Sequence, residues 1–264
     1  MKLKYGQDIS RYEQLFLKQI ITGRLSALQL QTVEAYFIYL NQNSVEAIEL
    51  IGALRNSHSE FFRNPLSYNI LERYLIPALY LNSNKKGTQE IRCWSAGCAA
   101  GQEAYSMAIM LEEFKNLHNT EALFRIFATD NSPAQLEMAR KGVYNFHTLQ
   151  NINLRHLKAY FTEVGDSYHL CHQIKSQVDF SIYDLLEKDT NSPSASVYGG
   201  FDIILCCNVL IYYKPEIQEY IIEKFCKSLN PGGILITGEA ESDIFKQVRK
   251  LKQFCSHSQI FIRL

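Results

Sequence analysis

The 264-residue sequence has no excess of either charge, no long apolar run and no cysteines paired at metal-binding spacing. Lysine plus arginine and aspartate plus glutamate number 27 each, so no overall electrostatic field attracts the chain to nucleic acid or to an anionic membrane. No run of about 18 apolar residues occurs, and we therefore expect no membrane insertion. The chain starts without the apolar stretch of a secretion signal, and its seven cysteines are scattered. We expect free thiols, no metal site and a cytoplasmic location.

The first eighty residues have the pattern of a helical domain. Apolar residues recur at helical spacing from Ser10 to about Leu54. Ser10 and Glu13 have the spacing of a capping box, which would start the first helix. Further helices are predicted over 27–40, from Ser44 onward and over 69–80. We predict an all-α domain over 1–81, followed by a polar surface linker over 82–87.

Beyond Thr88, short apolar runs alternate with helical segments. Strands are predicted over 91–95, 124–129, 178–183, 201–206, 234–238 and 258–264. Helices are predicted over 102–117, 133–141 and 215–229, the last one ended by a proline and two glycines. This alternation is typical of parallel strands joined by crossover helices. We therefore predict an α/β domain over 88–264 that contains a doubly wound sheet.

The segment from Phe161 to Ile174 does not fit this alternation, because it is too short for a strand and a helix. Gly165 and the two polar residues after it can form a tight turn. A strand-turn-strand insertion and an ordinary connecting loop are both compatible with the pattern.

Small residues follow the first predicted strand, with glycines at Gly97 and Gly101. Glycines there let the backbone approach a ligand at the edge where open α/β sheets bind ligands. The spacing is not that of a dinucleotide-binding loop, and Glu103 in the first helical turn would repel a pyrophosphate. This disfavours a dinucleotide-dependent oxidoreductase. It favours a cationic ligand such as the methionyl end of S-adenosylmethionine, with Glu103 as the counter-charge, although an ordinary turn is the alternative.

Acidic residues also end the second and third predicted strands. Asp130 is placed to accept hydrogen bonds from both ribose hydroxyls of an adenosine, or else to cap the helix that starts near Pro133. Asp184 is placed to accept a hydrogen bond from the adenine amine, and Leu185 to pack on its ring. The two strand ends together predict an adenosine site.

Polar residues beyond the fourth predicted strand would face the reactive methyl group. These are Asn208 and Tyr212, and Val209 and Leu210 follow the asparagine in the sequence. An adenine-directed N-methyltransferase would carry two prolines after the asparagine, so the sequence disfavours a nucleobase acceptor. Upstream, Arg63 follows two phenylalanines, an arrangement that a capped helix with core aromatics would also explain.

Together, these segments resemble the chemotaxis receptor glutamate methyltransferases of the CheR type. The shared motifs, in the family's order, are Phe61-Phe62-Arg63, Trp94 to Ser106, Ala128-Thr129-Asp130, Gly142-Val143-Tyr144 and Cys206 to Tyr212. The resemblance implies S-adenosylmethionine as methyl donor, S-adenosylhomocysteine as product and the cytoplasmic domain of a chemoreceptor as partner. It also implies a Rossmann-like methyltransferase sheet with an antiparallel last strand at its edge. A small antiparallel β-subdomain would be inserted at about 160–177, and in some members this subdomain docks a receptor's C-terminal peptide.

By position, the resemblance also implies which residues form the site. Those expected around the cofactor are Ser57, Ser59, Arg63, Gly97, Glu103, Asp130, Asp184, Leu185, Asn208 and Val209. Arg63 and Tyr212 would lie nearest the reacting carboxylate. We expect Arg63 to hold that carboxylate and Tyr212 to orient it.

The sequence departs from the family pattern in ways that bear on the acceptor. Cys207 stands where the family has an arginine that helps to hold the acidic substrate. The first helices carry few arginines, which leaves Lys18 and Arg24 as their main charges. Asp184 replaces a usual asparagine, a minor change that a cofactor site could tolerate. Two alternatives therefore stay open. One is a cofactor-binding signalling module without catalysis, and the other is a methyltransferase for another protein or a small acid.

Overall fold

The computed structural model describes the chain except for residues 1–7, 56–58, 87–89, 121–122 and 197–199. The chain forms two compact units. The first comprises the residues up to Ser57 together with Leu210–Glu219, and the second comprises His58–Val209 and Tyr220–Leu264. In the described ranges, no helix combines the length and apolar character needed to cross a membrane. All seven cysteines are free, as predicted.

The main helices of the first unit are α2 (Gln14–Ala27), α3 (Val33–Gln42) and α4 (Ser44–Leu54). Helix α3 begins six residues later than predicted, because the Thr32 side chain accepts a hydrogen bond from the Ala35 amide and so fixes the start. The predicted capping box is wrong. The Ser10 hydroxyl donates to Asp8 at 2.6 Å, and α2 begins without a side-chain cap.

A segment from far along the chain completes this unit. Tyr12 and Tyr213 pair as an antiparallel bridge, and their rings stack with centroids 5.2 Å apart. The Glu13 amide donates to the Tyr212 carbonyl at 2.9 Å. The Tyr212 ring packs on Phe16 with a centroid distance of 4.7 Å. Residues nearly 200 positions apart therefore form one apolar core.

A buried carboxylate lies in the core of the first unit. Glu46 is 4% exposed and accepts hydrogen bonds from Arg24 at 2.6 and 2.9 Å and from the Tyr36 hydroxyl at 2.8 Å. The Arg24 guanidinium holds the pKa of Glu46 below its usual value, and Glu49 also pairs with Arg24 at 3.5 Å. Arg24, one of the two main charges of the first helices, is thus engaged within the unit.

The second unit is built on a seven-stranded sheet within the described residues. Its strands are β1 (Glu90–Ala96), β2 (Leu123–Asp130), β6 (Val178–Ile182), β7 (Phe201–Cys206), β8 (Leu229–Thr237), β9 (Leu251–Gln253) and β10 (Ile260–Arg263). Their order is β6-β2-β1-β7-β8-β10-β9, which confirms the doubly wound sheet. Strand β10 is antiparallel to β8, as predicted, but β9 rather than β10 lies at the edge.

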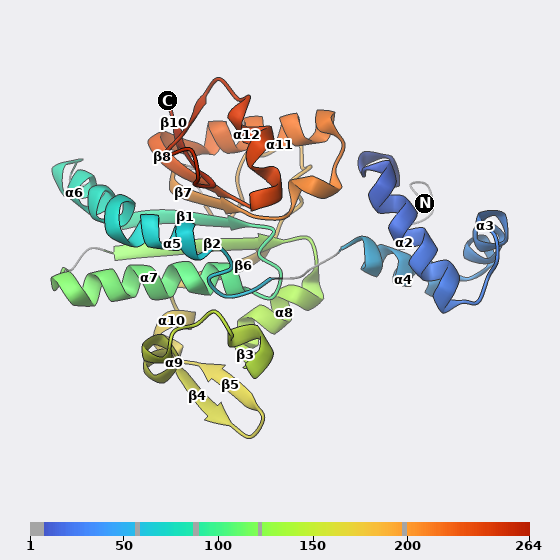
Figure 1. Ribbon diagram of the computed structural model, residues 1–264, viewed down its shortest axis with the longest axis horizontal. Helices are drawn as coiled ribbons and strands as arrows, with labels where there is room; N and C mark the ends of the chain where they lie inside the picture. Colours follow the sequence, from blue (N-terminus) through green and yellow to red (C-terminus); the bar gives the residue numbers. More distant parts are fainter. Residues whose placement is uncertain (1–7, 56–58, 87–89, 121–122, 197–199) are drawn as a thin grey trace. The chain divides into compact units, whose positions relative to one another are not determined.

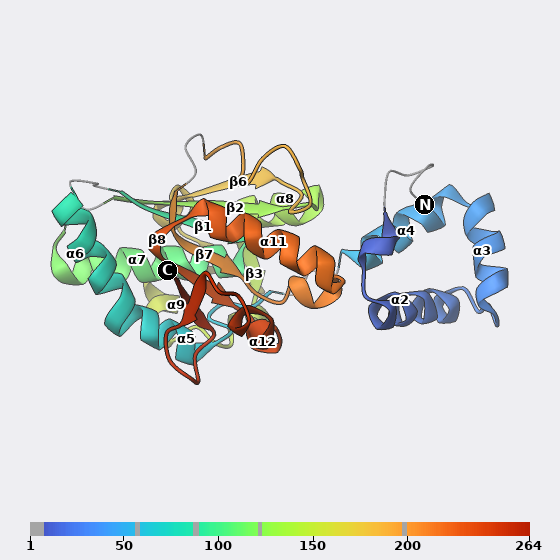
Figure 2. The same cartoon turned by 90° about the horizontal axis from the view of Figure 1, so that it is seen from above.

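Helices cover both faces of this sheet. Successive side chains of a strand point to opposite faces, so each central strand contacts both helical layers. Cys93 of β1 joins the core beneath α6 (Ile76–Lys86) and α7 (Gln102–His118). Trp94, the next residue, packs on Phe225 of α11 (Pro215–Ser228) at 5.4 Å. Figures 1 and 2 show α7 and α11 with these strands.

The helix predicted over 69–80 is longer than expected. It starts as α5 (Pro65–Ile70), passes through a π-helical turn (Leu71–Leu75) and continues as α6. Asn64 caps its start by accepting a hydrogen bond from the Ser67 amide. The helical backbone runs to Lys86 through most of the predicted linker. The whole of this helix belongs to the second unit.

A small antiparallel sheet confirms the strand-turn-strand prediction. It contains β3 (Val143–Asn145), β4 (Phe161–Val164) and β5 (Ser167–Leu170) in the order β3-β5-β4. Gly165 forms the turn with a φ of +58°. Helices α8 (Pro133–Lys141), α9 (Leu154–Tyr160) and α10 (His172–Lys175) flank it along the chain, and it projects at the bottom of Figure 1.

Candidate active site

A cavity of about 380 Å³ lies at the carboxyl ends of β1, β7 and β8. Ligands bind at this edge in open α/β sheets. Five of the predicted site residues line it: Ser59, Arg63, Gly97, Glu103 and Asn208. The structure thus brings together residues that are spread over 150 positions in the sequence.

The loop after β1 forms one wall, and Gly97 is its tightest position. Gly97 has a φ of +74°, which side-chain-bearing residues rarely adopt, and its amide donates to the Thr129 carbonyl at 2.8 Å. A Cβ on this glycine would lie 2.6 Å from Val209 Cγ2. Val209, predicted to contact the cofactor, is not among the residues that line the cavity. It packs against Gly97, and its contact with the cofactor stays a prediction.

We expect Gly97→Ala to destabilise the fold by about 1–3 kcal/mol, because it combines a disfavoured φ with a steric overlap. Urea unfolding of the full chain measures this loss. Gly165→Ala is the matched control, since its φ of +58° is similar but nothing lies within 4 Å of the added Cβ. The double variant Gly97→Ala/Val209→Ala should recover the steric part. Equal losses at Gly97 and Gly165 would contradict this assignment.

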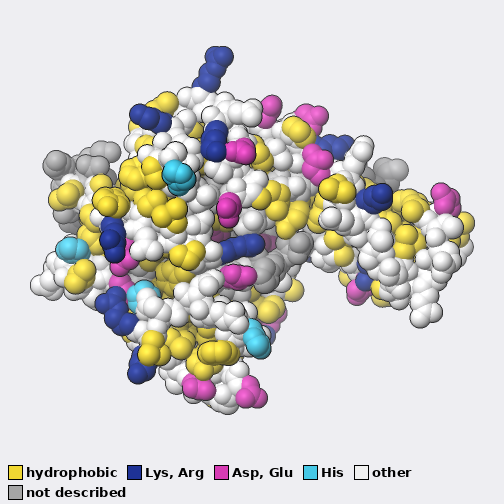
Figure 3. Space-filling model, viewed as in Figure 1, with side chains coloured by type: hydrophobic (Ala, Val, Ile, Leu, Met, Phe, Trp, Pro, Cys, Tyr) yellow, Lys and Arg dark blue, Asp and Glu magenta, His cyan; other side chains and the backbone are white. Residues whose placement is uncertain are grey.

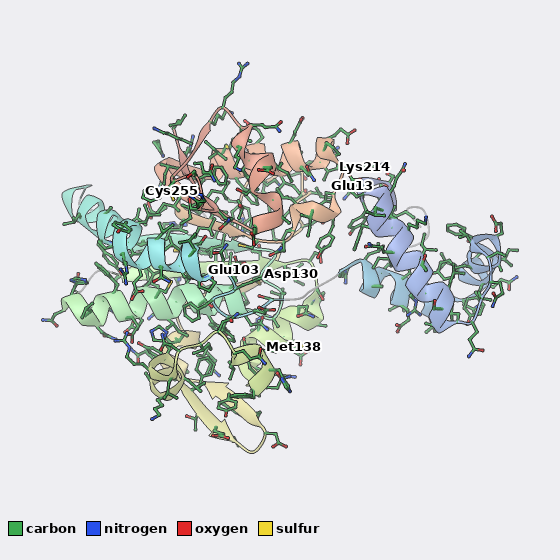
Figure 4. The ribbon with its side chains drawn as sticks, viewed as in Figure 1. Glu13, Glu103, Asp130, Met138, Lys214 and Cys255 are labelled. Atoms are coloured by element: carbon green, nitrogen blue, oxygen red, sulfur yellow. The ribbon has the colours of Figure 1, made fainter. Side chains whose placement is uncertain are left out.

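Glu103 supplies a buried carboxylate at the first turn of α7 and is labelled in Figure 4. The residue is 9% exposed, and burial raises the pKa of its carboxyl to about 7. The neighbouring Cys207 thiol and the charge of Arg63 both lower the pKa of this carboxyl. Glu241 acts in the opposite direction. A carboxylate so short of solvation is stabilised further by a ligand that brings a positive charge.

Cys207 stands in the position of the family arginine and has a different role here. Burial and the nearby Glu103 raise the pKa of its thiol well above the usual value, so the thiol stays protonated, and it donates to the Ile236 carbonyl at 3.9 Å. Among the described residues that line the cavity, Arg63 is the one lysine or arginine. Charged side chains of both signs are scattered over the face shown in Figure 3. An acidic acceptor in this cavity would therefore depend on Arg63.

Asp130, labelled in Figure 4, ends β2. Its carboxylate accepts hydrogen bonds from the Ala99 amide at 3.0 Å and from the Ser132 amide at 2.8 Å. The alternative that Asp130 caps the following helix is wrong, because Ser132 is the residue that caps α8. Asp130 ties the loop after β1 to the end of β2. It does not line the cavity, and its contact with a ribose stays a prediction.

The segment after β6 carries Asp184 and Leu185. Asp184 is exposed and its carboxylate accepts a hydrogen bond from the Leu186 amide at 2.9 Å, whereas Leu185 is 6% exposed. A buried lysine, Lys224, supports this segment by donating to the Tyr183 hydroxyl at 3.0 Å. Neither Asp184 nor Leu185 lines the cavity, so their roles at an adenine stay predictions.

Two further predicted residues are not placed at the cavity. Ser57 lies outside the described residues. Tyr212 belongs to the first unit, where its ring packs on Phe16. Its role beside the acceptor stays a prediction.

Several residues of the cavity wall were not singled out in the sequence. They are Glu60, Asn64, Ser67, Tyr68, Ile236, Thr237, Gly238, Glu239 and Ala240. The sequence could have indicated the segment after β8 as part of the site, because the carboxyl ends of parallel strands meet at one edge of the sheet. Tyr68 gives no such signal, since it lies inside a helix. Among the described residues, no group of three or more histidine, cysteine or acidic side chains is arranged to hold a metal.

The strand order, the antiparallel β10 between β8 and β9, and the cavity at the carboxyl edge define the class of Rossmann-like S-adenosylmethionine-dependent methyltransferases. A family model described as "CheR methyltransferase, SAM binding domain" matches residues 57–260. The chain belongs to the CheR methyltransferase family.

Relatives match over most of the chain. A Listeria innocua protein named "Chemotaxis protein methyltransferase" is 32% identical over 241 residues, which cover 91% of this chain and 86% of the relative. The Salmonella typhimurium protein of the same name is 33% identical over 229 residues, which cover 84% of this chain and 74% of the relative. A "Probable biofilm formation methyltransferase WspC" from Pseudomonas aeruginosa is 28% identical over 247 residues, which cover 94% of this chain and 56% of the relative. Among solved structures, the PH0226 protein of Pyrococcus horikoshii aligns over 70% of this chain and 66% of its own, with 15% identity and a TM-score of 0.34.

Proposed function

We propose that this protein transfers the methyl group of S-adenosylmethionine to glutamate side chains in the cytoplasmic domain of chemoreceptors. The products would be a glutamate methyl ester and S-adenosylhomocysteine. One observation carries the proposal: the same cavity contains the buried carboxylate of Glu103 and the guanidinium of Arg63. The first suits the ammonium group of the cofactor, and the second suits an acidic acceptor. The names of the Listeria and Salmonella relatives support the choice of receptor.

The walls fit this cofactor. Burial leaves Glu103 with a raised pKa, and an ammonium group would compensate the poorly solvated charge. Gly97 and Asn208 line the same cavity. The other residues that would surround the cofactor are Ser57, Ser59, Arg63, Asp130, Asp184, Leu185 and Val209. When bound, S-adenosylmethionine supplies a methyl group that is made electrophilic by the adjacent sulfonium.

The protein's part in the reaction is positioning rather than proton transfer. A glutamate carboxylate is already ionised at neutral pH, so it needs no general base to become a nucleophile. Arg63 holds this carboxylate by charge-assisted hydrogen bonds, and Tyr212 orients it. The cavity walls exclude water from the reacting atoms. Correct placement of two reactants in such a site contributes several kcal/mol to catalysis.

Transfer of labelled methyl from S-adenosylmethionine to a chemoreceptor cytoplasmic fragment tests this proposal. We expect label that alkali releases, as a methyl ester requires. A receptor fragment with its candidate glutamates changed to glutamine is the control, and it should stay unlabelled. Tight binding of S-adenosylhomocysteine by calorimetry without any label would contradict receptor methylation.

That outcome would favour a second candidate, for which Cys207 provides the observation. Because Arg63 is the one lysine or arginine in the described cavity wall, the site is less cationic than the family pattern. A methyltransferase for another protein or a small acid, or a cofactor-binding signalling module, would then fit better. The Pseudomonas relative is named for biofilm formation rather than for chemotaxis.

Three further parts of the proposal concern organisation. We place the protein in the cytoplasm, where receptor domains of this kind are located. We also propose that the sheet of β3, β4 and β5 docks a receptor's C-terminal peptide, since β4 is an edge strand of the described sheet. Finally, we propose a functional division into a helical part over 1–81 and a cofactor domain over 88–264; in the fold, α5 and α6 pack with the compact unit that contains the sheet.

A further inference from the structure

The carboxylate of Glu241 joins the segments that follow β7 and β8. Glu241 is 0% exposed and ends a short 3₁₀ turn, Glu239–Glu241. Its Oε2 accepts hydrogen bonds from the Asn208 amide at 2.7 Å and from the Gly238 amide at 3.1 Å. A single buried oxygen therefore holds two backbone positions that follow different strands.

Both of those positions line the cavity. Asn208 has a φ of +59°, a left-handed conformation that needs support from its surroundings. Gly238 packs closely, because a Cβ there would lie 2.8 Å from the Asn208 nitrogen and 3.0 Å from Glu241 Oε2. The carboxylate thus sets where two parts of the cavity wall lie.

Glu241 also acts on Glu103 through its charge. Its carboxylate raises the pKa of Glu103, in the same direction as burial. The other groups that face Glu103 are Cys207, Arg63, Tyr68, Cys98 and Cys206. Of these, Arg63 brings a positive charge. Glu241 therefore influences the group expected to bind the cofactor's ammonium as well as the backbone beside it.

We propose that Glu241 is a positioning residue for methyl transfer, which fixes the backbone of Asn208 and Gly238 in the cavity wall. Glu241 does not line the cavity itself. Its effect on turnover rests on the proposed function, whereas its effect on cofactor binding does not. The two kinds of measurement therefore separate a failure of this proposal from a failure of the proposed function.

Three variants of the full chain test the proposal. Glu241→Gln keeps one oxygen for both amide donors but removes the charge, whereas Glu241→Ala removes both hydrogen bonds. Asp243→Asn is the control, because Asp243 is an exposed acid two residues away that pairs with Lys246. We expect Glu241→Ala to lower kcat about 100-fold, the size of effect that a misplaced site produces, with a smaller change in the acceptor KM. The kcat of Glu241→Gln should stay within about threefold of that of the unchanged protein. The kcat of Asp243→Asn should equal that of the unchanged protein.

The pH dependence of S-adenosylhomocysteine binding gives a second readout, measured by calorimetry between pH 5.5 and 8.5. Glu241→Gln removes a negative charge near Glu103, so the pH midpoint of binding should shift downward. A purely structural residue would not move this midpoint in a correctly folded variant. If Glu241→Ala does not fold, Glu241→Gln alone decides. An unchanged midpoint in Glu241→Gln, or an equal loss of turnover in Glu241→Gln and Glu241→Ala, would overturn the proposal.

Discussion

Glu103→Gln should remove most of the affinity for S-adenosylhomocysteine and at the same time make the unliganded protein more stable. The carboxyl pKa of Glu103 is raised from 4.5 to about 7 by burial, so keeping the ionised form in the fold costs about 3 kcal/mol above pH 7. A neutral glutamine avoids this cost. It also removes the negative charge that would pair with the ammonium group of the ligand. Urea unfolding at pH 8.5 and calorimetry of the same variant measure the two effects.

The sign of the pH dependence follows from the raised pKa. Between pH 4.5 and about 7 the folded protein binds more protons than the unfolded chain. The free energy of unfolding is therefore highest at low pH and falls as pH rises through that window. Ligand affinity should change in the opposite direction, because the carboxylate must be ionised to pair with an ammonium. Glu103→Gln should flatten both profiles.

Glu112→Gln is the matched control for this prediction. Glu112 lies on the same helix and is 4% exposed, but it is paired with Gln173 and is not part of the cavity wall. Its substitution should leave ligand affinity unchanged. A Glu103→Gln variant that binds the ligand as tightly as the unchanged protein would show that Glu103 does not hold the ammonium group.

Arg63→Ala should lower turnover at least 100-fold while it changes the affinity for S-adenosylhomocysteine far less. Removing a preorganised charged donor at a reacting group has effects of this size. Here no second lysine or arginine in the described cavity wall takes over its role. Single-turnover methyl transfer and calorimetry on the same preparation separate the two quantities.

Two comparisons sharpen this prediction. Arg63→Lys keeps the charge but not the planar pair of donors, so it should recover part of the turnover. Arg73→Ala is the control, because Arg73 is an exposed arginine on the following helical segment. Unchanged turnover in Arg63→Ala would exclude the role of this arginine in holding the acceptor.

Much of the sheet was predictable because strands and helices of the second unit have clear ends. The limits of β7 and α8 are as predicted, and α7 and α11 differ by one residue. Strand β3 was not predicted, since three residues are too few to show an alternating pattern. The start of α3 was missed because apolar residues continue the helical spacing across the loop before it. Local hydrogen bonds decided that boundary.

For the site, the sequence indicated residues at strand ends but not the contacts between them. Glu103 and Asn208 were identified from their positions after strands. The electrostatic interaction between Cys207 and Glu103 was not predictable, because it joins residues that only the folded sheet brings together. The same holds for Glu241, whose partners are set by the closeness of β7 and β8.

The bridge between Tyr12 and Tyr213 affects how the chain can fold during synthesis. Helices α2 to α4 leave the ribosome first, but residues 210–219, which complete their core, emerge only after about four fifths of the protein has been made. Closing so long a loop carries an entropic cost and slows folding. Because Leu210 comes only four residues after the end of β7, the first unit can become complete only when the chain has passed through the central strands of the second. The order of translation thus makes the smaller unit, although it is synthesised first, one of the last parts to be finished.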